Sequence, residues 1–214
     1  LGGSGLFPAV ALLDPELTLS LPWQETLFTA LDTTSHALET LWNRHATPVS
    51  KAMAVEALRL LDPLLPRLEH GLSDLAMREQ LQTASLFAGL AISQSRTALA
   101  HAISYPLTLH YAVPHGLACS FTLPALIRHV QAAQAFPNAT PVPLLQRIEK
   151  ALRQFELHKL LHCYCSTEDV LKHIDEMFDP ARADNFVLEV EGSLVKKLLL
   201  VSCDGYKGSE SASL

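Results

Sequence analysis

Apolar residues recur every three or four positions along most of this chain, which is the spacing of one buried face of a helix. Leucines keep this spacing through residues 23–42, after a proline, Pro22, that suits the first turn of a helix. A second helical pattern covers residues 50–61, where Ser50 is placed to cap the first turn. We therefore expect a helix in each of these two segments.

A long segment rich in alanine and leucine, without proline, runs from Asp74 to Ala102. Its middle, residues 84–92, is apolar almost all the way round, which is typical of a helix buried on every side. The pattern predicts one long helix that Pro106 ends. The leucines expected in its core are Leu75, Leu81, Leu86, Leu90 and Leu99.

The second half of the chain contains shorter helical patterns. One begins at Pro114, an amphipathic one covers residues 144–161, and Ser166 caps another that reaches Met177. Residues 208–213 are small and polar, and we expect this end to be frayed.

The first twenty or so residues do not follow this helical pattern. Residues 9–13 form a short apolar run closed by Asp14 and Pro15, which favours a buried strand or the remnant of one. The whole pattern predicts an all-α fold, a helical bundle, with a short β remnant at its N-terminus. Since residue 1 is Leu1 and no basic leader follows, the sequence is typical of a fragment or a processed product.

Composition excludes several classes of protein. Apolar residues make up 49% of the chain and charged residues 18%, so it is not a disordered chain. A net charge of −6 gives no general electrostatic reason to bind nucleic acid. The four cysteines lack the spacing of a disulfide framework, and no apolar run is long enough to span a membrane. A reduced, cytoplasmic protein is the simplest interpretation.

The spacing of the histidines, ten in all, suggests a metal site. Asp32 and His36 are four residues apart in a helical pattern, so both side chains lie on one face, one turn apart. His101 ends the long apolar segment and His115 begins the next helix, so the two can converge across a helix–helix corner. One carboxylate and three imidazoles would suit Fe²⁺ or Zn²⁺.

Each of these residues also has a plain structural interpretation. An aspartate and a histidine four apart often occur by chance, and His101 could be a core histidine bonded to a carbonyl group. The position of Asp32 favours a metal site, because the residue lies in apolar sequence, where an unpaired charge is costly. The same ligands could activate water in a metal hydrolase, but we expect Glu39 to lie off the Asp32 face, which leaves no general base.

Two motifs resemble the iron-containing (group III) alcohol dehydrogenases. Residues 14–22 (DPELTLSLP) and 31–39 (LDTTSHALE) resemble the start of the metal-binding half of that family. Residues 100–107 (AHAISYPL) and 113–118 (VPHGLA) resemble its second motif, in which two metal-binding histidines are fourteen residues apart. Within the family, the segments around Tyr105 and Cys119 are most similar to phosphonoacetaldehyde reductases.

The resemblance implies that Asp32, His36, His101 and His115 bind iron. It implies a dehydroquinate synthase-like helical domain over residues 23–214, preceded in 1–22 by the remnant of an N-terminal α/β cofactor domain. Many members carry a histidine facing cofactor and substrate at the position of Tyr105, which here is a candidate substrate-binding residue or a half-buried aromatic.

The expected activity is hydride transfer between NAD(P)H and a small aldehyde or alcohol, with Fe²⁺ or Zn²⁺ as Lewis acid. Most of the cofactor domain is missing, since Gly2, Gly3 and Gly5 lack the strand and helix of a phosphate-binding loop, so this chain alone should be inactive. The alternative is a truncated, non-catalytic module of the same fold that binds metal or forms oligomers. Neither hypothesis includes nucleic acid or a membrane as partner, and both allow a homo-oligomer.

Overall fold

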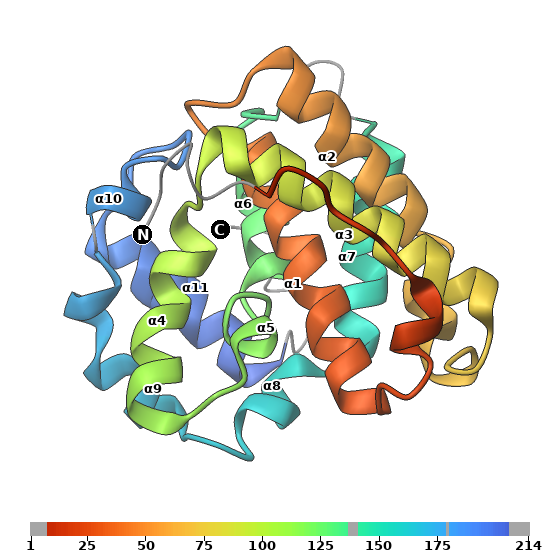
Figure 1. Ribbon diagram of the computed structural model, residues 1–214. Coiled ribbons are helices and arrows are strands. Elements are labelled where there is room, and N and C mark those ends of the chain that lie inside the picture. The colour runs from red at the N-terminus through yellow and green to blue at the C-terminus, as the bar shows by residue number, and fades with distance from the viewer. Residues whose placement is uncertain (1–7, 137–140, 179, 206–214) are drawn as a thin grey trace.

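The computed structural model describes residues 8–136, 141–178 and 180–205, and in these residues every regular element is a helix. Helix α1 lies at the centre, with α2 and α3 packed on one side and α5 on the other (Figure 1). The elements in order are η2 (Pro15–Thr18), α1 (Trp23–Leu41), α2 (Pro48–Leu61), η3 (Leu65–His70), α3 (Leu75–Ser95), α4 (Leu99–Tyr111), α5 (His115–Ala118), α6 (Leu123–Ala132), α7 (Val142–Gln154), α8 (Leu157–Leu161), α9 (Thr167–Lys172), η4 (Ile174–Met177), α10 (Pro180–Ala183) and α11 (Gly192–Asp204). The predicted all-α fold is confirmed.

The first two helices begin at or near the predicted positions. Helix α1 starts directly after Pro22. Helix α2 starts one turn earlier than expected, because Thr47 is its cap and Ser50 completes a capping box, in which each side chain accepts the other's backbone N–H. Proline at the first position of α2 explains why the expected cap, Ser50, lies inside the helix.

The single long helix expected over residues 74–102 is two helices. Helix α3 ends at Ser95, Arg96 adopts a left-handed φ of 66°, and α4 begins at Leu99. Pro106 does not end α4 but lies within it, since the helix continues to Tyr111. The segment expected over 144–161 is likewise divided into α7 and α8, with Glu156 at a φ of 47°.

Helix α3 turns alanines, not leucines, towards the core. Leu86 and Leu90 are 38% and 41% exposed, and Leu75 is exposed as well, so the expectation of a helix buried on all sides is wrong. Its fully buried residues in the middle are Ala84, Ala88 and Ala91. These small side chains allow α3 to pack closely against α1 and α2.

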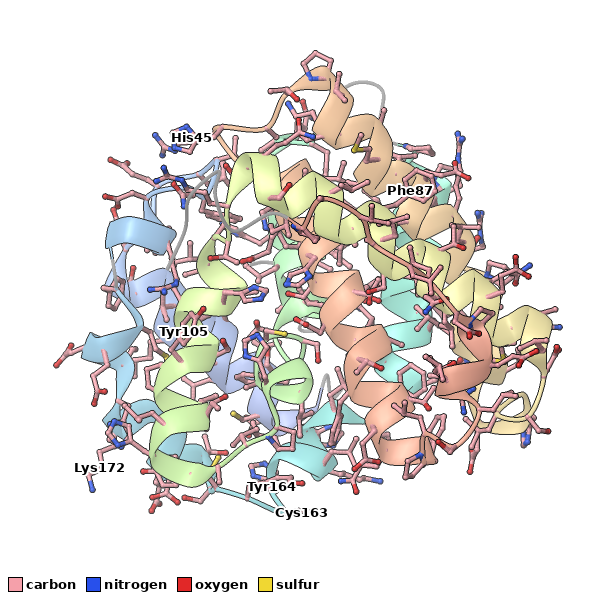
Figure 2. All side chains as sticks on the ribbon, viewed as in Figure 1. His45, Phe87, Tyr105, Cys163, Tyr164 and Lys172 are labelled. Carbon is pink, nitrogen blue, oxygen red and sulfur yellow. The ribbon has the colours of Figure 1, made fainter. Side chains whose placement is uncertain are left out.

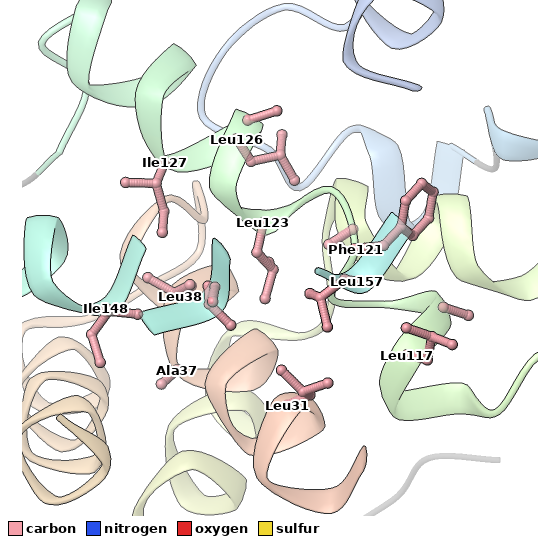
Figure 3. Packing of buried hydrophobic residues seen from close by; sticks show 14 of the residues in the cluster. Leu31, Ala37, Leu38, Leu117, Phe121, Leu123, Leu126, Ile127, Ile148 and Leu157 are labelled. Carbon is pink, nitrogen blue, oxygen red and sulfur yellow. The ribbon is translucent and has the colours of Figure 1, made fainter. Parts of the chain in front are cut away.

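The core between α1 and the second half of the bundle is built from branched side chains. Leu31 and Leu38 of α1 are fully buried and lie with Leu123 and Ile127 of α6 and Ile148 of α7 (Figure 3). This interface fixes α1, which carries the first predicted site residues, against the rest of the domain.

The strand expected at residues 9–13 does not form among the described residues. Val10 and Leu12 are 83% and 91% exposed, and no neighbouring backbone pairs with them in a strand. A strand without a partner leaves its N–H and C=O groups unpaired, which explains the irregular conformation. The glycines at 2, 3 and 5 and the segment 208–213 lie outside the described residues. No helix in the part described combines the length and apolar character that crossing a bilayer requires.

Candidate metal centre

The three histidines predicted to bind metal each place a ring nitrogen beside Asp32, although His36 is not in the group of ligand atoms that all lie within 4.8 Å of one another. Asp32 and His36 come from α1, His101 from α4 and His115 from α5. Asp32 Oδ1 lies 3.5 Å from His36 Nε2, 3.6 Å from His101 Nε2 and 3.7 Å from His115 Nε2. The His36 and His101 rings are stacked, with centroids 5.1 Å apart. A single carboxylate oxygen thus faces three imidazole nitrogens.

The close approach of α5 to α1 depends on a glycine. A Cβ at Gly116 would collide with the backbone oxygen of Phe28 in α1. Ser35 adds a hydrogen bond from α1 to the carbonyl oxygen of Cys119, at 3.1 Å. The Pro-His-Gly sequence therefore has a physical role, since only glycine after His115 lets this short helix place the imidazole beside Asp32.

Glu39 positions His101. Its carboxylate is fully buried and accepts a hydrogen bond from His101 Nδ1 at 2.7 Å. It also accepts the backbone N–H groups of Ala98, Ala100 and His101, at 2.9, 2.6 and 3.3 Å, at the start of α4. The expectation that Glu39 lies off the Asp32 face is wrong: it is seven residues, or two turns, from Asp32. Because the Glu39 carboxylate already accepts these four hydrogen bonds, it is not available to act as the general base of a hydrolase.

The arrangement fits a divalent cation. His101 Nε2 is buried and has no hydrogen-bond partner, although it faces Asp32 Oδ1. Metal–nitrogen and metal–oxygen bonds of roughly 2.1 Å place neighbouring ligand atoms about 3.0–3.5 Å apart. The observed separations of 3.5–3.7 Å between Asp32 and the three imidazoles are close to that range. A cation would satisfy the orphaned nitrogen and the half-buried carboxylate together.

The charges at this point are strongly coupled. Burial alone would raise the pKa of Asp32, but contact with His101 and the other imidazoles outweighs it and lowers the pKa to about 2. Burial would lower the pKa of His101, but the attraction of Glu39 and Asp32 raises it to about 9. Burial also lowers the pKa of His36 and of His115. Without metal, Asp32 is an anion and His101 carries the compensating proton.

Cys119 is a neighbour that the sequence did not single out for this site. Its thiol donates a hydrogen bond to Asp32 Oδ1 at 3.3 Å, and burial holds its pKa well above the ordinary range. One ligand atom each from Asp32, His101, His115 and Cys119 lies within 4.8 Å of the others. The four-residue spacing from His115 is the signal that could have identified it.

Tyr105 lies on α4 one turn after His101 (Figure 2). It is 43% exposed, and its ring centroid is 6.1 Å from that of His115. The guanidinium carbon of Arg182 lies 4.1 Å from the centre of the Tyr105 ring, a cation–π contact. Tyr105 therefore borders the cluster on the side that solvent reaches.

A separate hollow of about 220 Å³ lies between η2, α1 and α3. Thr29 and Thr33 of α1 line it, together with Arg78, which donates to Thr26 Oγ1 at 2.8 Å. None of the four predicted ligands lines it, but Thr33 directly follows Asp32 in α1.

Comparison with known proteins agrees with the motifs. A family model described as Fe-containing alcohol dehydrogenase family, C-terminal, matches residues 26–183. The chain is 38% identical over 125 residues to the 1-propanol dehydrogenase PduQ of Salmonella typhimurium, covering 58% of this chain and 34% of that protein. It is 36% identical over 141 residues to the phosphonoacetaldehyde reductase of Streptomyces viridochromogenes, covering 66% and 36%. The chain spans about a third of the length of these curated relatives.

The fold also resembles solved structures of reductases and alcohol dehydrogenases. The chain is similar to the sulfoacetaldehyde reductase from Bifidobacterium kashiwanohense, a structure in complex with NAD⁺, with a TM-score of 0.79 and 26% identity. That match covers 94% of this chain and 56% of the other. An iron-containing alcohol dehydrogenase from Thermotoga maritima has a TM-score of 0.74 and 28% identity, covering 93% and 55%.

Proposed function

Since the chain belongs to the Fe-containing alcohol dehydrogenase family, we propose that it is the metal-binding half of an NAD(P)-linked alcohol dehydrogenase or aldehyde reductase. The observation that carries the proposal is the convergence of three imidazole nitrogens on one oxygen of Asp32. The reaction is hydride transfer between a nicotinamide and a small aldehyde or alcohol. The ion is Fe²⁺, with Zn²⁺ as the alternative that the same donors accept.

Asp32, His36, His101 and His115 are the proposed ligands. When bound, the ion would supply Lewis-acid chemistry, polarising the substrate oxygen on which negative charge develops during hydride transfer. Asp32 neutralises one of its two charges, which leaves a net positive centre. Glu39 holds the His101 ring so that Nε2 faces the ion, because Nδ1 donates its proton to Glu39.

The domain boundaries remain as proposed from the sequence, with residues 23–214 as the helical domain and 1–22 as the remnant of a cofactor domain. The exposure of Val10, Leu12 and Leu17, at 83%, 91% and 76%, supports a surface that a further domain covers. In the complete protein, NADH or NADPH would bind on that domain and reach the metal centre. We also propose that the complete protein is a cytoplasmic homo-oligomer.

Tyr105 is the proposed substrate-binding residue of this half. Tyr105 is 43% exposed, and its hydroxyl group can donate a hydrogen bond to a substrate beside His115. Arg182, 4.1 Å from the Tyr105 ring, adds a positive charge at the same edge. Since one relative is a phosphonoacetaldehyde reductase, an aldehyde that carries an anionic group is a candidate substrate.

The test is an assay of the complete gene product, purified without oxygen and loaded with Fe²⁺. We expect NADH- or NADPH-dependent reduction of small aldehydes, reduced about 100-fold or more by Asp32→Asn and His115→Ala, since Lewis-acid stabilisation contributes several kcal/mol. A complete protein that binds iron but reduces no aldehyde would instead support the alternative, a non-catalytic metal-binding or oligomerisation module.

A further inference from the structure

A second cluster of metal-ligating side chains lies at the other end of α4. His110 is the next-to-last residue of this helix, His173 directly follows α9, and Glu176 belongs to η4. One ligand atom from each lies within 4.8 Å of the other two. His110 and His101 are nine residues apart, about 13 Å along the helix, so the cluster is separate from the centre at Asp32.

One carboxylate joins the two rings. Glu176 Oε2 lies 2.8 Å from His110 Nε2, and Glu176 Oε1 lies 2.6 Å from His173 Nδ1. The rings are stacked, with centroids 4.0 Å apart and planes 15° apart. Both ring nitrogens therefore point to the same side, towards the two oxygens of one carboxylate.

Tyr111 holds the other nitrogen of the His173 ring. Its hydroxyl lies 3.1 Å from His173 Nε2 and 3.4 Å from Asp169 Oδ1. With Nε2 beside Tyr111, the ring is oriented so that Nδ1 faces Glu176.

In the metal-free chain, one N–H of each ring can donate a hydrogen bond to one oxygen of Glu176, at 2.8 Å from His110 and 2.6 Å from His173. A divalent cation can replace these two protons, since it accepts both nitrogens and the carboxylate at once. Two imidazoles and a glutamate are a ligand set that Zn²⁺ takes in proteins.

We propose that His110, His173 and Glu176 form a second divalent-cation site, which binds Zn²⁺ at the surface of the domain. The side chains of His110 and Glu176 are 35% and 47% exposed, so solvent can supply the remaining ligand. Lys172, which precedes His173, marks this edge of the molecule beside the end of α4 (Figure 2). A bound ion would link the end of α4 to η4, which packs against it.

Zinc titration of the metal-free chain tests this site, with bound zinc measured by elemental analysis after equilibrium dialysis. We expect two zinc ions bound per unmodified chain. His110→Ala and Glu176→Gln should each bind one. His70→Ala, which removes an exposed histidine elsewhere, should retain both. Tyr111→Phe should weaken the second equivalent about 10- to 100-fold, because it removes the group that orients His173.

Two results would overturn the proposal: a single zinc equivalent in the unmodified chain, or two equivalents in both His110→Ala and Glu176→Gln. The variant His115→Ala separates the two sites. It should lose the equivalent at Asp32 and keep the one at Glu176, whether or not the complete protein reduces aldehydes.

Discussion

The Glu39 carboxylate accepts the Nδ1 proton of His101 at 2.7 Å, and this bond determines that the other ring nitrogen faces Asp32. The same carboxylate accepts backbone N–H groups at the start of α4, of which that of Ala100 is the closest at 2.6 Å. One buried side chain thus caps a helix and orients a proposed ligand, His101, on that helix. Burial would raise the pKa of Glu39, but its contact with His101 outweighs burial and keeps the pKa lowered.

Replacing this carboxylate should weaken metal binding without removing a ligand. In Glu39→Gln the amide cannot accept from His101 and the start of α4 as the carboxylate does, so His101 loses its fixed orientation. We expect the affinity for Fe²⁺ or Zn²⁺ at Asp32 to fall about 10- to 100-fold. Metal titration of the chain measures this change, with circular dichroism to verify that the helices remain.

The matched control is Glu25→Gln, on the exposed part of the same helix. It removes an equal charge and should leave the affinity unchanged. An affinity in Glu39→Gln equal to that in Glu25→Gln would contradict the role of Glu39 in positioning His101.

Local spacing predicted which four residues lie close together but not the groups that position them. Asp32 and His36 are one helical turn apart, and the interval from His101 to His115 belongs to a motif, so sequence pattern suffices for all four. The role of Glu39 depends on a contact between residues 62 positions apart, which no local pattern encodes. The break at Arg96 has the same origin, since α4 begins where Glu39 accepts its first N–H groups.

The remaining errors concern burial. Leu86 and Leu90 look like core residues in a window of sequence, but the alanines of α3 pack on α1 and α2 and leave these leucines outside. The run at 9–13 is apolar yet exposed, with Leu12 at 91%. Apolar character predicts burial only where a packing partner is present, and hydrophobic pattern alone does not identify that partner.

The close contact of α5 with α1 predicts a specific cost for adding one methyl group. In Gly116→Ala the new Cβ meets the backbone oxygen of Phe28, which cannot move without shifting α1. We expect a loss of about 1–3 kcal/mol in the free energy of unfolding, together with weaker metal binding, because His115 would move away from Asp32. Urea denaturation and metal titration measure the two effects.

Gly89→Ala is the control for that substitution. Gly89 lies inside α3, and a Cβ there meets nothing within 4 Å. Since alanine favours a helix over glycine, we expect a gain of about 0.5–1 kcal/mol. If Gly116→Ala were as stable as Gly89→Ala, the close packing of α5 on α1 would not be what places His115.

The stability of the metal-free chain should depend on pH through His101. Its pKa is raised from 6.5 to about 9, so the folded state holds this proton more tightly than the unfolded state. The stabilisation is complete below about pH 6.5 and is lost as the pH rises towards 9, a decrease of up to about 3 kcal/mol. Urea denaturation with a chelator at pH 6, 7.5 and 9 measures this decrease.

Metal should reverse this trend. A ligand nitrogen must be free of its proton, so metal affinity rises with pH through the same interval, and loaded protein should not lose stability between pH 6.5 and 9. Glu39→Gln, which removes the largest charge that raises the pKa of His101, should flatten the decrease in the metal-free chain. An equally steep decrease in that variant would assign the pH dependence to other groups.

Tyr105→Phe separates substrate binding from metal binding in the complete protein. The substitution removes one hydroxyl group and keeps the ring that contacts His115 and Arg182, so metal content should stay unchanged. If the hydroxyl donates to the substrate, KM for the aldehyde should rise about 3- to 10-fold, which corresponds to one hydrogen bond of about 1 kcal/mol. Steady-state kinetics with elemental analysis of the same samples provides both values. Unchanged KM and kcat would assign Tyr105 a structural role, in which its ring only packs against His115 and Arg182.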